Sequence, residues 1–336
     1  MTHDTHELGD ITLQSGAVLA QARLAYKTFG TLNPARDNVI VYPTSFAATH
    51  DDAMWLIGPG RALDPLKYFI VVPDAFANGL SSSPSNTGAP QHGRDFPTVT
   101  LHDNVVQQQR LLCERFGVER IRLALGWSLG GAQAFEWAAS FPERVERLFA
   151  FQSAARTSRH FHVFFDSVRM AIELDPAFEQ GAYTRPPECG LRAAARVYAA
   201  WGFSQAFFRK RLDQTALGYA SLEAFLVEFW EAWFLKRDAN DIIAQLCAGQ
   251  GADISANHRY QGDFAKALAA IQADTVLMPS SSDLYFPVAD AELEAKGIAN
   301  AELRVLHSDW GHVAGEGLNQ ADTQAIERTI AELLAR

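Results

Sequence analysis

The sequence contains little cysteine and no cysteine pattern. Three cysteines occur among 336 residues, Cys113, Cys189 and Cys247, and none belongs to a CxxC pair. An odd and widely spaced set predicts neither a disulfide framework nor a zinc knuckle. Buried, unreactive thiols are the simplest interpretation. This composition fits a reducing, cytoplasmic location.

Long apolar runs and an excess of positive charge are also missing. No stretch of about 18 uninterrupted apolar residues is present, so no membrane span is expected. The N-terminus, MTHDTHELGDITL, has neither the basic nor the apolar region of a secretory signal. The net charge of −10 argues against nucleic acid or an anionic membrane as partner, because both bind basic faces. HExxH, Walker and GxGxxG motifs and acidic metal clusters are absent, so no metal or other cofactor is expected.

What the sequence does contain is short apolar runs that alternate with longer helical stretches. This alternation is typical of parallel βαβ units, whose sheet is covered by helices on both faces. The length and the 48% of hydrophobic residues suit a single α/β core that carries an insertion. Strands are predicted at 38–42, 68–72, 121–125, 147–151, 275–278 and 303–306, and helices at 104–116, 129–140 and 322–334.

Strand signals disappear between about residues 155 and 265. Aromatic and alanine-rich helical segments replace them, over 193–208 and 222–233. We therefore expect an α/β core formed by residues 1–154 and 266–336, into which residues 155–265 are inserted as a helical lid.

The decisive motif is Gly126-Trp127-Ser128-Leu129-Gly130, directly after a predicted strand and directly before a predicted helix. A nucleophile elbow requires this context, because its serine lies on a sharp strand-to-helix turn that flanking glycines keep free of clashes. The N-terminus of the following helix offers partial positive charge to a developing oxyanion. Because GxSxG also occurs in ordinary tight turns, the prediction depends on an acid and a histidine further along the chain. Together with those residues, the motif predicts the α/β-hydrolase fold, with Ser128 as nucleophile.

Two downstream residues complete a triad with Ser128. A serine hydroxyl needs a base to take its proton, and in this fold an acid and then a histidine follow the serine, each after a later strand. Asp283 follows the strand predicted at 275–278, and His312 follows the strand predicted at 303–306. Competing residues, which could be loop side chains without a catalytic role, are His307 for the base and Asp290 and Asp309 for the acid.

The oxyanion hole should use two backbone N–H groups. In this fold one comes from the residue after the nucleophile, here Leu129, and the other from the loop after an early strand. The loop after the strand predicted at 38–42 reads Pro43-Thr44-Ser45-Phe46-Ala47. Its candidate donors are Ser45 and Phe46.

Several short stretches occur along the chain in a fixed order: Ala25-Tyr26-Lys27-Thr28-Phe29-Gly30, Ile57-Gly58-Pro59-Gly60, Phe96-Pro97-Thr98-Val99-Thr100, the elbow with Gln133, Glu136 and Trp137, and Val168-Arg169-Met170-Ala171-Ile172. Through these stretches, and over nearly its whole length, the sequence resembles the homoserine O-acetyltransferases, which are α/β hydrolases with a helical lid. The resemblance implies the same triad, Ser128, Asp283 and His312, and a homodimer formed through the lid.

This resemblance does not fix the reaction, because the family also contains esterases that hydrolyse short acyl esters. The acetyltransferases usually have GGSMGG at the elbow, where Trp127 here precedes the nucleophile. They usually have an Asp after the catalytic histidine, where this chain has Val313. A lid tyrosine is lost, with Trp201 and Gly202 near its position. Arg169 matches a family arginine suited to binding a substrate carboxylate, although a salt bridge within the lid explains it equally well.

The lost charged contacts favour hydrolysis over transfer to an amino acid, since each charged hydrogen bond is worth about 1.5–3 kcal/mol. The sequence therefore predicts a serine carboxylester hydrolase of small acyl esters, acetate esters in particular, that works through an acyl-enzyme. Two alternatives remain: acyl transfer from acetyl-CoA to homoserine or another hydroxyl, and an inactive relative that only binds a ligand. Candidate residues for an apolar acyl pocket are Phe46, Trp127 and Phe286.

Overall fold

The computed structural model of the protein describes residues 2–336, and its centre is an eight-stranded sheet in the order β1-β2-β4-β3-β5-β6-β7-β8. Strand β2 pairs antiparallel with both of its neighbours, β1 and β4, and all the other neighbours in the sheet pair in parallel. The predicted, mostly parallel α/β sheet is thereby confirmed. The strands are β1 (Asp4–Thr12), β2 (Val18–Phe29), β3 (Val39–Val41), β4 (Phe69–Pro73), β5 (Leu123–Trp127), β6 (Arg147–Phe151), β7 (Asp274–Met278) and β8 (Ala301–Leu303).

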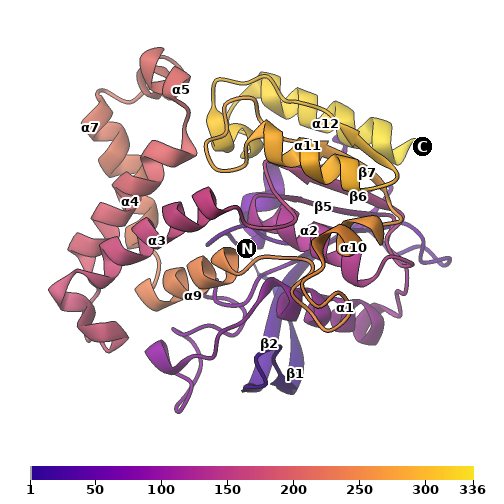
Figure 1. The fold of residues 1–336 in the computed structure, drawn as a ribbon, viewed down its shortest axis with the longest axis horizontal. Helices are drawn as coiled ribbons and strands as arrows, with labels where there is room; N and C mark the ends of the chain where they lie inside the picture. The colour runs from indigo at the N-terminus through magenta and orange to yellow at the C-terminus, as the bar shows by residue number, and fades with distance from the viewer. Residues whose placement is uncertain (1) are drawn as a thin grey trace.

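Helices cover both faces of this sheet (Figure 1). Successive side chains of a strand point to opposite faces, so Ile40 belongs to one hydrophobic core while Val39 and Val41 belong to the other. Helices α1 and α2 contribute to the second core, and α12 to the first. The helices of the core are α1 (Leu101–Phe116), α2 (Leu129–Ser140), α10 (Phe264–Ala269), α11 (Val288–Gly297) and α12 (Gln320–Leu334).

The ends of the core helices follow local capping chemistry. Helix α1 begins three residues before the predicted start, because Thr100 and Asp103 form a capping box that satisfies its first N–H groups. It ends at Gly117, whose φ of 62° places it in the left-handed region that glycine adopts without strain. Helix α12 similarly starts after Asn319, whose side chain accepts a hydrogen bond from Ala321 N–H.

Residues 159–250, between β6 and β7, form a group of helices that stands to one side of the sheet (Figure 1). The helix predicted over 193–208 is broken at Phe203, and Ser204 caps a new helix by accepting a hydrogen bond from Phe207 N–H. None of the helices in residues 2–336 combines the length and apolar character that crossing a bilayer requires. The helices of this segment are α3 (Arg159–Glu173), η3 (Pro176–Gly181), α4 (Glu188–Gly202), α5 (Gln205–Arg209), α6 (Leu212–Thr215), α7 (Leu222–Phe225), η4 (Leu226–Glu231), α8 (Ala232–Leu235) and α9 (Ala239–Gln250).

Candidate active site

Ser128 lies at the strand-to-helix turn between β5 and α2. Its φ of 56° and ψ of −128° form a conformation that is rare for a residue with a side chain. The glycines make the turn possible: a Cβ on Gly126 would lie 2.2 Å from the carbonyl carbon of Gly130, and one on Gly130 would lie 2.5 Å from Pro43 O. The structure thus has the geometry expected of a nucleophile elbow.

The structure brings Asp283 and His312 into contact. His312 Nδ1 lies 2.8 Å from Asp283 Oδ2, and both side chains are buried. The other oxygen of Asp283 accepts hydrogen bonds from the backbone N–H groups of Tyr285 and Phe286, at 3.0 and 3.1 Å. These bonds fix the carboxylate, which in turn orients the imidazole. Nε2 of His312 is buried without a hydrogen-bond partner among the described residues, so it is free to accept a proton.

The competing residues make other contacts. His307 is exposed to solvent. Asp309 forms an ion pair with Lys210. Asp290 lies in the first turn of α11, where burial raises the pKa of its carboxyl. Among the candidates, Asp283 and His312 are the acid and the histidine that contact each other.

The loop after β3 approaches α2 at the elbow. A buried glutamine, Gln133 on α2, donates from Nε2 to Thr44 O at 2.9 Å and accepts from Gln108 Nε2 at 2.7 Å. The backbone N–H groups of Ser45 and Phe46 make no hydrogen bond within the described part of the chain. Both residues line the cavity that contains Ser128. Either N–H is therefore free to donate to an oxyanion, together with that of Leu129.

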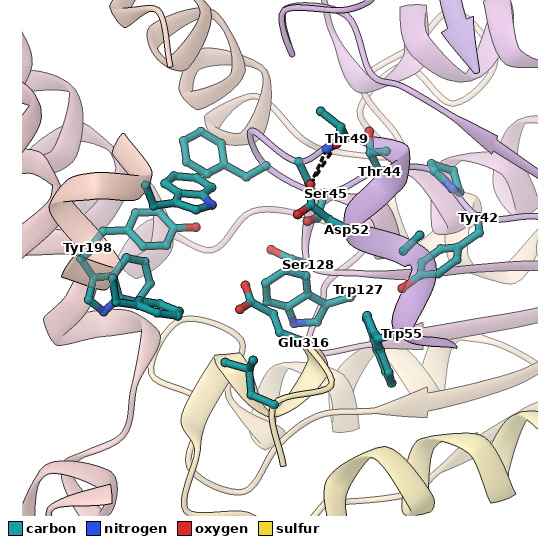
Figure 2. A pocket seen from close by; sticks show the side chains of 18 residues that line it. Tyr42, Thr44, Ser45, Thr49, Asp52, Trp55, Trp127, Ser128, Tyr198 and Glu316 are labelled. Carbon is teal, nitrogen blue, oxygen red and sulfur yellow. Dashed lines mark hydrogen bonds between the residues drawn. The ribbon is translucent and has the colours of Figure 1, made fainter. Parts of the chain in front are cut away.

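Ser128 opens into a cavity of about 250 Å³ between the sheet and the helical segment. Figure 2 shows Trp127 and Glu316 beside Ser128, with Tyr198 across the cavity. Phe46 stacks on Tyr198, with ring centroids 5.5 Å apart. Burial raises the pKa of the Tyr198 hydroxyl, which therefore stays protonated at neutral pH. The other lining residues are Tyr42, Pro43, Thr44, Ser45, Ala48, Thr49, Asp52, Ala53, Trp55, Phe229, Trp230, Trp233 and Leu318.

The charged groups in this lining are acidic. Asp52 and Glu316 line the cavity, and within residues 2–336 no lysine, arginine or histidine is part of its lining. Burial, with a smaller effect of Asp52, raises the pKa of Glu316 to about 8, so this side chain is mostly neutral at pH 7. Arg237, whose guanidinium lies over the Trp233 ring, acts electrostatically on Glu316, and burial lowers the pKa of Arg237 to about 10.

Three residues singled out in the sequence lie outside the cavity. Arg169 pairs along α3 with Asp166 at 2.7 Å and with Glu173 at 4.0 Å, so it is not available to bind a substrate carboxylate in this arrangement. The ring of Phe286 packs on Phe161 with centroids 4.8 Å apart, so it is not part of the lining either. Val313 is buried.

Sequence reasoning missed most of the lining contributed by the helical segment. Tyr198 comes from α4, Phe229 and Trp230 from η4, and Trp233 from α8. A pair of aromatics three residues apart, as at 230 and 233, indicates a shared helix face, but not what that face meets. No sequence pattern indicated that Glu316 lines the cavity, apart from its position four residues after His312.

Comparisons with known proteins agree with this geometry. A family model described as alpha/beta hydrolase fold matches residues 38–316. Ethyl acetate hydrolase from Pseudomonas veronii is 37% identical over 331 residues, covering 98% of this chain and 94% of that protein. The structure of the acetyl esterase MekB superimposes with a TM-score of 0.97 at 36% identity, covering 100% of this chain and 97% of that one. Homoserine O-acetyltransferase from Chloroherpeton thalassium is 30% identical over 314 residues, covering 90% of this chain and 82% of that protein.

Proposed function

Because this chain belongs to the α/β-hydrolase fold family, we propose that it is a serine carboxylester hydrolase that cleaves small acyl esters, acetate esters in particular. The observation that carries the proposal is the buried 2.8 Å contact between His312 and Asp283, made by a histidine stacked on the residue that precedes Ser128. A carboxylate that orients an imidazole beside an elbow serine is the arrangement that makes a hydroxyl nucleophilic.

In the acylation step, Ser128 Oγ attacks the ester carbonyl carbon while His312 Nε2 takes the hydroxyl proton. Asp283 keeps the imidazole in the tautomer with its free lone pair on Nε2. The oxyanion is stabilised by the N–H of Leu129 and by that of Ser45 or Phe46. The tetrahedral intermediate collapses when His312 returns the proton to the alcohol, which leaves.

Deacylation repeats these steps with water. His312 takes a proton from a water molecule, the hydroxyl attacks the acyl carbon, and Ser128 recovers its proton as the acid leaves. The cavity supports a small substrate, since its 250 Å³ and its aromatic walls suit a short acyl ester. The names of two similar proteins, an ethyl acetate hydrolase and an acetyl esterase, support acetate as the acyl group.

The second candidate function is acyl transfer from acetyl-CoA to a hydroxyl acceptor. It is favoured by the 30% identity with a homoserine O-acetyltransferase over most of the chain. Against it, Arg169 is paired within α3 and the cavity lining carries carboxyl groups where a zwitterionic acceptor would need a cation for its carboxylate. Hydrolysis therefore remains the main proposal.

We infer that residues 155–265 act as a lid and that two copies associate through it. The insertion contributes Tyr198 and Trp233 to the lining, so it covers the side of the cavity that lies opposite the sheet. The apolar side chains of Val163 and Met170 on α3 and of Leu174 at its C-terminal cap are exposed, and a second copy would cover them. The three cysteines are free, but the prediction that they are buried is wrong, since Cys189 is exposed and Cys113 and Cys247 are half-buried. Three free thiols fit a reducing, cytoplasmic environment.

The test is a product analysis by mass spectrometry with the purified protein. One tube receives ethyl acetate, and another receives acetyl-CoA with L-homoserine. Acetate release from the ester, lost in Ser128→Ala, with no O-acetylhomoserine in the second tube, is the expected result. Efficient O-acetylhomoserine formation would establish the transferase instead. Binding of ester without turnover would mean that the protein is a ligand-binding relative.

A further inference from the structure

Both polar groups of the Ala47 backbone, its N–H and its C=O, form hydrogen bonds with residues of the helical insertion. Its N–H donates to Oε1 of Gln245 at 2.6 Å, and its C=O accepts from Nε of Arg237 at 2.8 Å. Gln245 lies on α9, is buried, and donates from Nε2 to Phe76 O at 3.0 Å. Ala47 belongs to the core, 190 or more residues away along the chain.

The side chain of Arg237 is itself held in one orientation. Its guanidinium lies 3.5 Å from the centroid of the Trp233 ring and donates from Nη1 to Trp233 O at 2.6 Å. Stacking on an aromatic ring and a planar fork of donors hold an arginine in one orientation. The donor that reaches Ala47 is therefore pre-oriented.

The other end of the same loop is anchored to the core. Thr44 donates its N–H to Pro73 O at 3.2 Å and accepts from Gln133 Nε2 on its own carbonyl. Between this core anchor and the insertion's anchor at Ala47 lie only Ser45 and Phe46. These two residues carry the free N–H groups that the proposed mechanism needs.

Ala47 also has a φ of 49°, in the left-handed region that a residue with a Cβ adopts only when its surroundings impose it. Gln245 and Arg237 supply part of that constraint, and the rest comes from the turn in which Ala48 N–H donates to Ser45 O at 3.2 Å. If it is released, Ala47 relaxes to negative φ and the neighbouring peptides rotate.

We propose that Gln245 and Arg237 are positioning residues, through which the insertion aims the second N–H of the oxyanion hole. The inference rests on the proposed ester hydrolysis and adds that the insertion acts on the chemical step as well as covering the cavity. Neither side chain lines the cavity, so their effect passes through the Ala47 backbone.

The experiment compares Gln245→Met, which keeps the size of the side chain and removes both hydrogen bonds, with Gln245→Glu, which keeps an acceptor for Ala47 N–H. Gln250→Met is the matched control, because Gln250 lies on the same helix and bonds only within the insertion, to His162 O at 3.1 Å. We expect Gln245→Met to lower kcat for a neutral acetate ester by about tenfold to a hundredfold, less than the ~10²–10³-fold cost of a missing oxyanion donor. KM should change little, Gln245→Glu should recover part of the loss, and Gln250→Met should resemble the wild type.

A second readout separates positioning from a general loss of structure. Ser128 Oγ adds to the carbonyl carbon of a trifluoromethyl ketone while the hydroxyl proton passes from Ser128 to His312, and the former carbonyl oxygen then lies in the hole as an oxyanion. Its inhibition constant should rise across the variants in proportion to the fall in kcat/KM, while inhibition by the product alcohol stays constant. Arg237→Lys perturbs the hydrogen bond to the C=O of Ala47. It should show the same proportionality between the inhibition constant and kcat/KM, even if one Gln245 variant folds poorly.

Wild-type kcat in Gln245→Met and Arg237→Lys would overturn the inference, and so would a fall in kcat without weaker ketone binding. A failure of the proposed function looks different: the wild-type protein would then release no acetate from the ester, whatever the Gln245 variants do.

Discussion

The indole of Trp127 contacts His312 in two ways. Its Nε1–H donates to the backbone O of His312 at 3.0 Å, and its ring stacks on the imidazole with centroids 4.7 Å apart. The residue before the proposed nucleophile therefore helps to fix the proposed base. Room for the indole comes from Gly315, because a Cβ there would lie 2.2 Å from Trp127 Cδ1.

Replacing Trp127 by Phe keeps an aromatic ring but removes the hydrogen bond to His312 O. A neutral hydrogen bond contributes about 1 kcal/mol, so we expect kcat/KM for a neutral acetate ester to fall roughly fivefold. Steady-state kinetics measure this. Trp201→Phe is the control, since Trp201 lies in the insertion outside the cavity lining. An unchanged kcat/KM in Trp127→Phe would show that the hydrogen bond from Trp127 does not help to orient His312.

Replacing Asp283 by Asn should be far more damaging. The amide offers His312 Nδ1 an N–H as readily as an oxygen, which favours the tautomer with the proton on Nε2. In a serine–histidine–aspartate triad this costs about 10⁴-fold in kcat. Asp290→Asn, at the rival carboxyl, should retain activity. If Asp290→Asn instead lost its activity and Asp283→Asn retained it, Asp290 would be identified as the acid.

Glu316 should make the enzyme discriminate against anionic esters as the pH rises. Its pKa of about 8 means that it is mostly neutral at pH 7 and mostly charged at pH 9. Two like charges roughly 10 Å apart repel by about 1.5 kcal/mol at an effective dielectric constant of about 20. Relative to a neutral ester of equal size, kcat/KM for an ester with a carboxylate should fall about tenfold across this range.

Using the ratio of the two substrates cancels every effect of pH that acts on both substrates alike. In Glu316→Gln the ratio should stay level between pH 7 and 9. A ratio that falls equally in wild type and variant would assign the effect to a group other than Glu316.

Glu294 should make the stability of the protein fall with pH. It lies buried on α11, where Oε1 accepts from Ala155 N–H at 2.7 Å and burial raises its pKa to about 8. Its usual pKa is 4.5, so between these values the folded state keeps a proton that the unfolded state has released. The free energy of unfolding therefore decreases as the pH rises from about 4.5 to about 8. Above about pH 8, Glu294 no longer makes it depend on pH.

Glu294→Gln keeps the acceptor for Ala155 and removes the titration. Thermal unfolding across pH 5 to 9 should show the Tm of the variant rising relative to wild type up to about pH 8 and then levelling off. Glu292→Gln, an exposed neighbour on the same helix, should show no such trend. A Tm difference that is independent of pH would mean that Glu294 is not protonated in the folded protein.

Local signals in the sequence were sufficient for the elbow and for the strands around it. The bounds predicted for the helix at 129–140 and the strand at 147–151 agree with α2 and β6, because glycine spacing and continuous apolar runs act over a few residues. The hairpin of β1 and β2 was not predicted. Only Leu8 and Ile11 of β1 are buried, so this edge strand lacks the apolar run that marks the central ones. The last strand, predicted at 303–306, lies instead at 301–303, at the opposite edge of the sheet.

The cavity could not be predicted in the same way, because it forms where segments remote in sequence meet. No spacing rule indicates that Tyr198 will stack on Phe46. For Arg169, by contrast, a local signal was present: Asp166 and Glu173 lie three and four residues away, the spacing of ion pairs on a helix.

The order of the site residues along the chain has a consequence for synthesis. Ser128 and its elbow leave the ribosome well before Gln245, Asp283 and His312, which lie much further along the chain. A nascent or truncated chain that ends before residue 312 carries the serine without the proposed base. Ester cleavage through the proposed triad can therefore begin only after residue 312 has been translated.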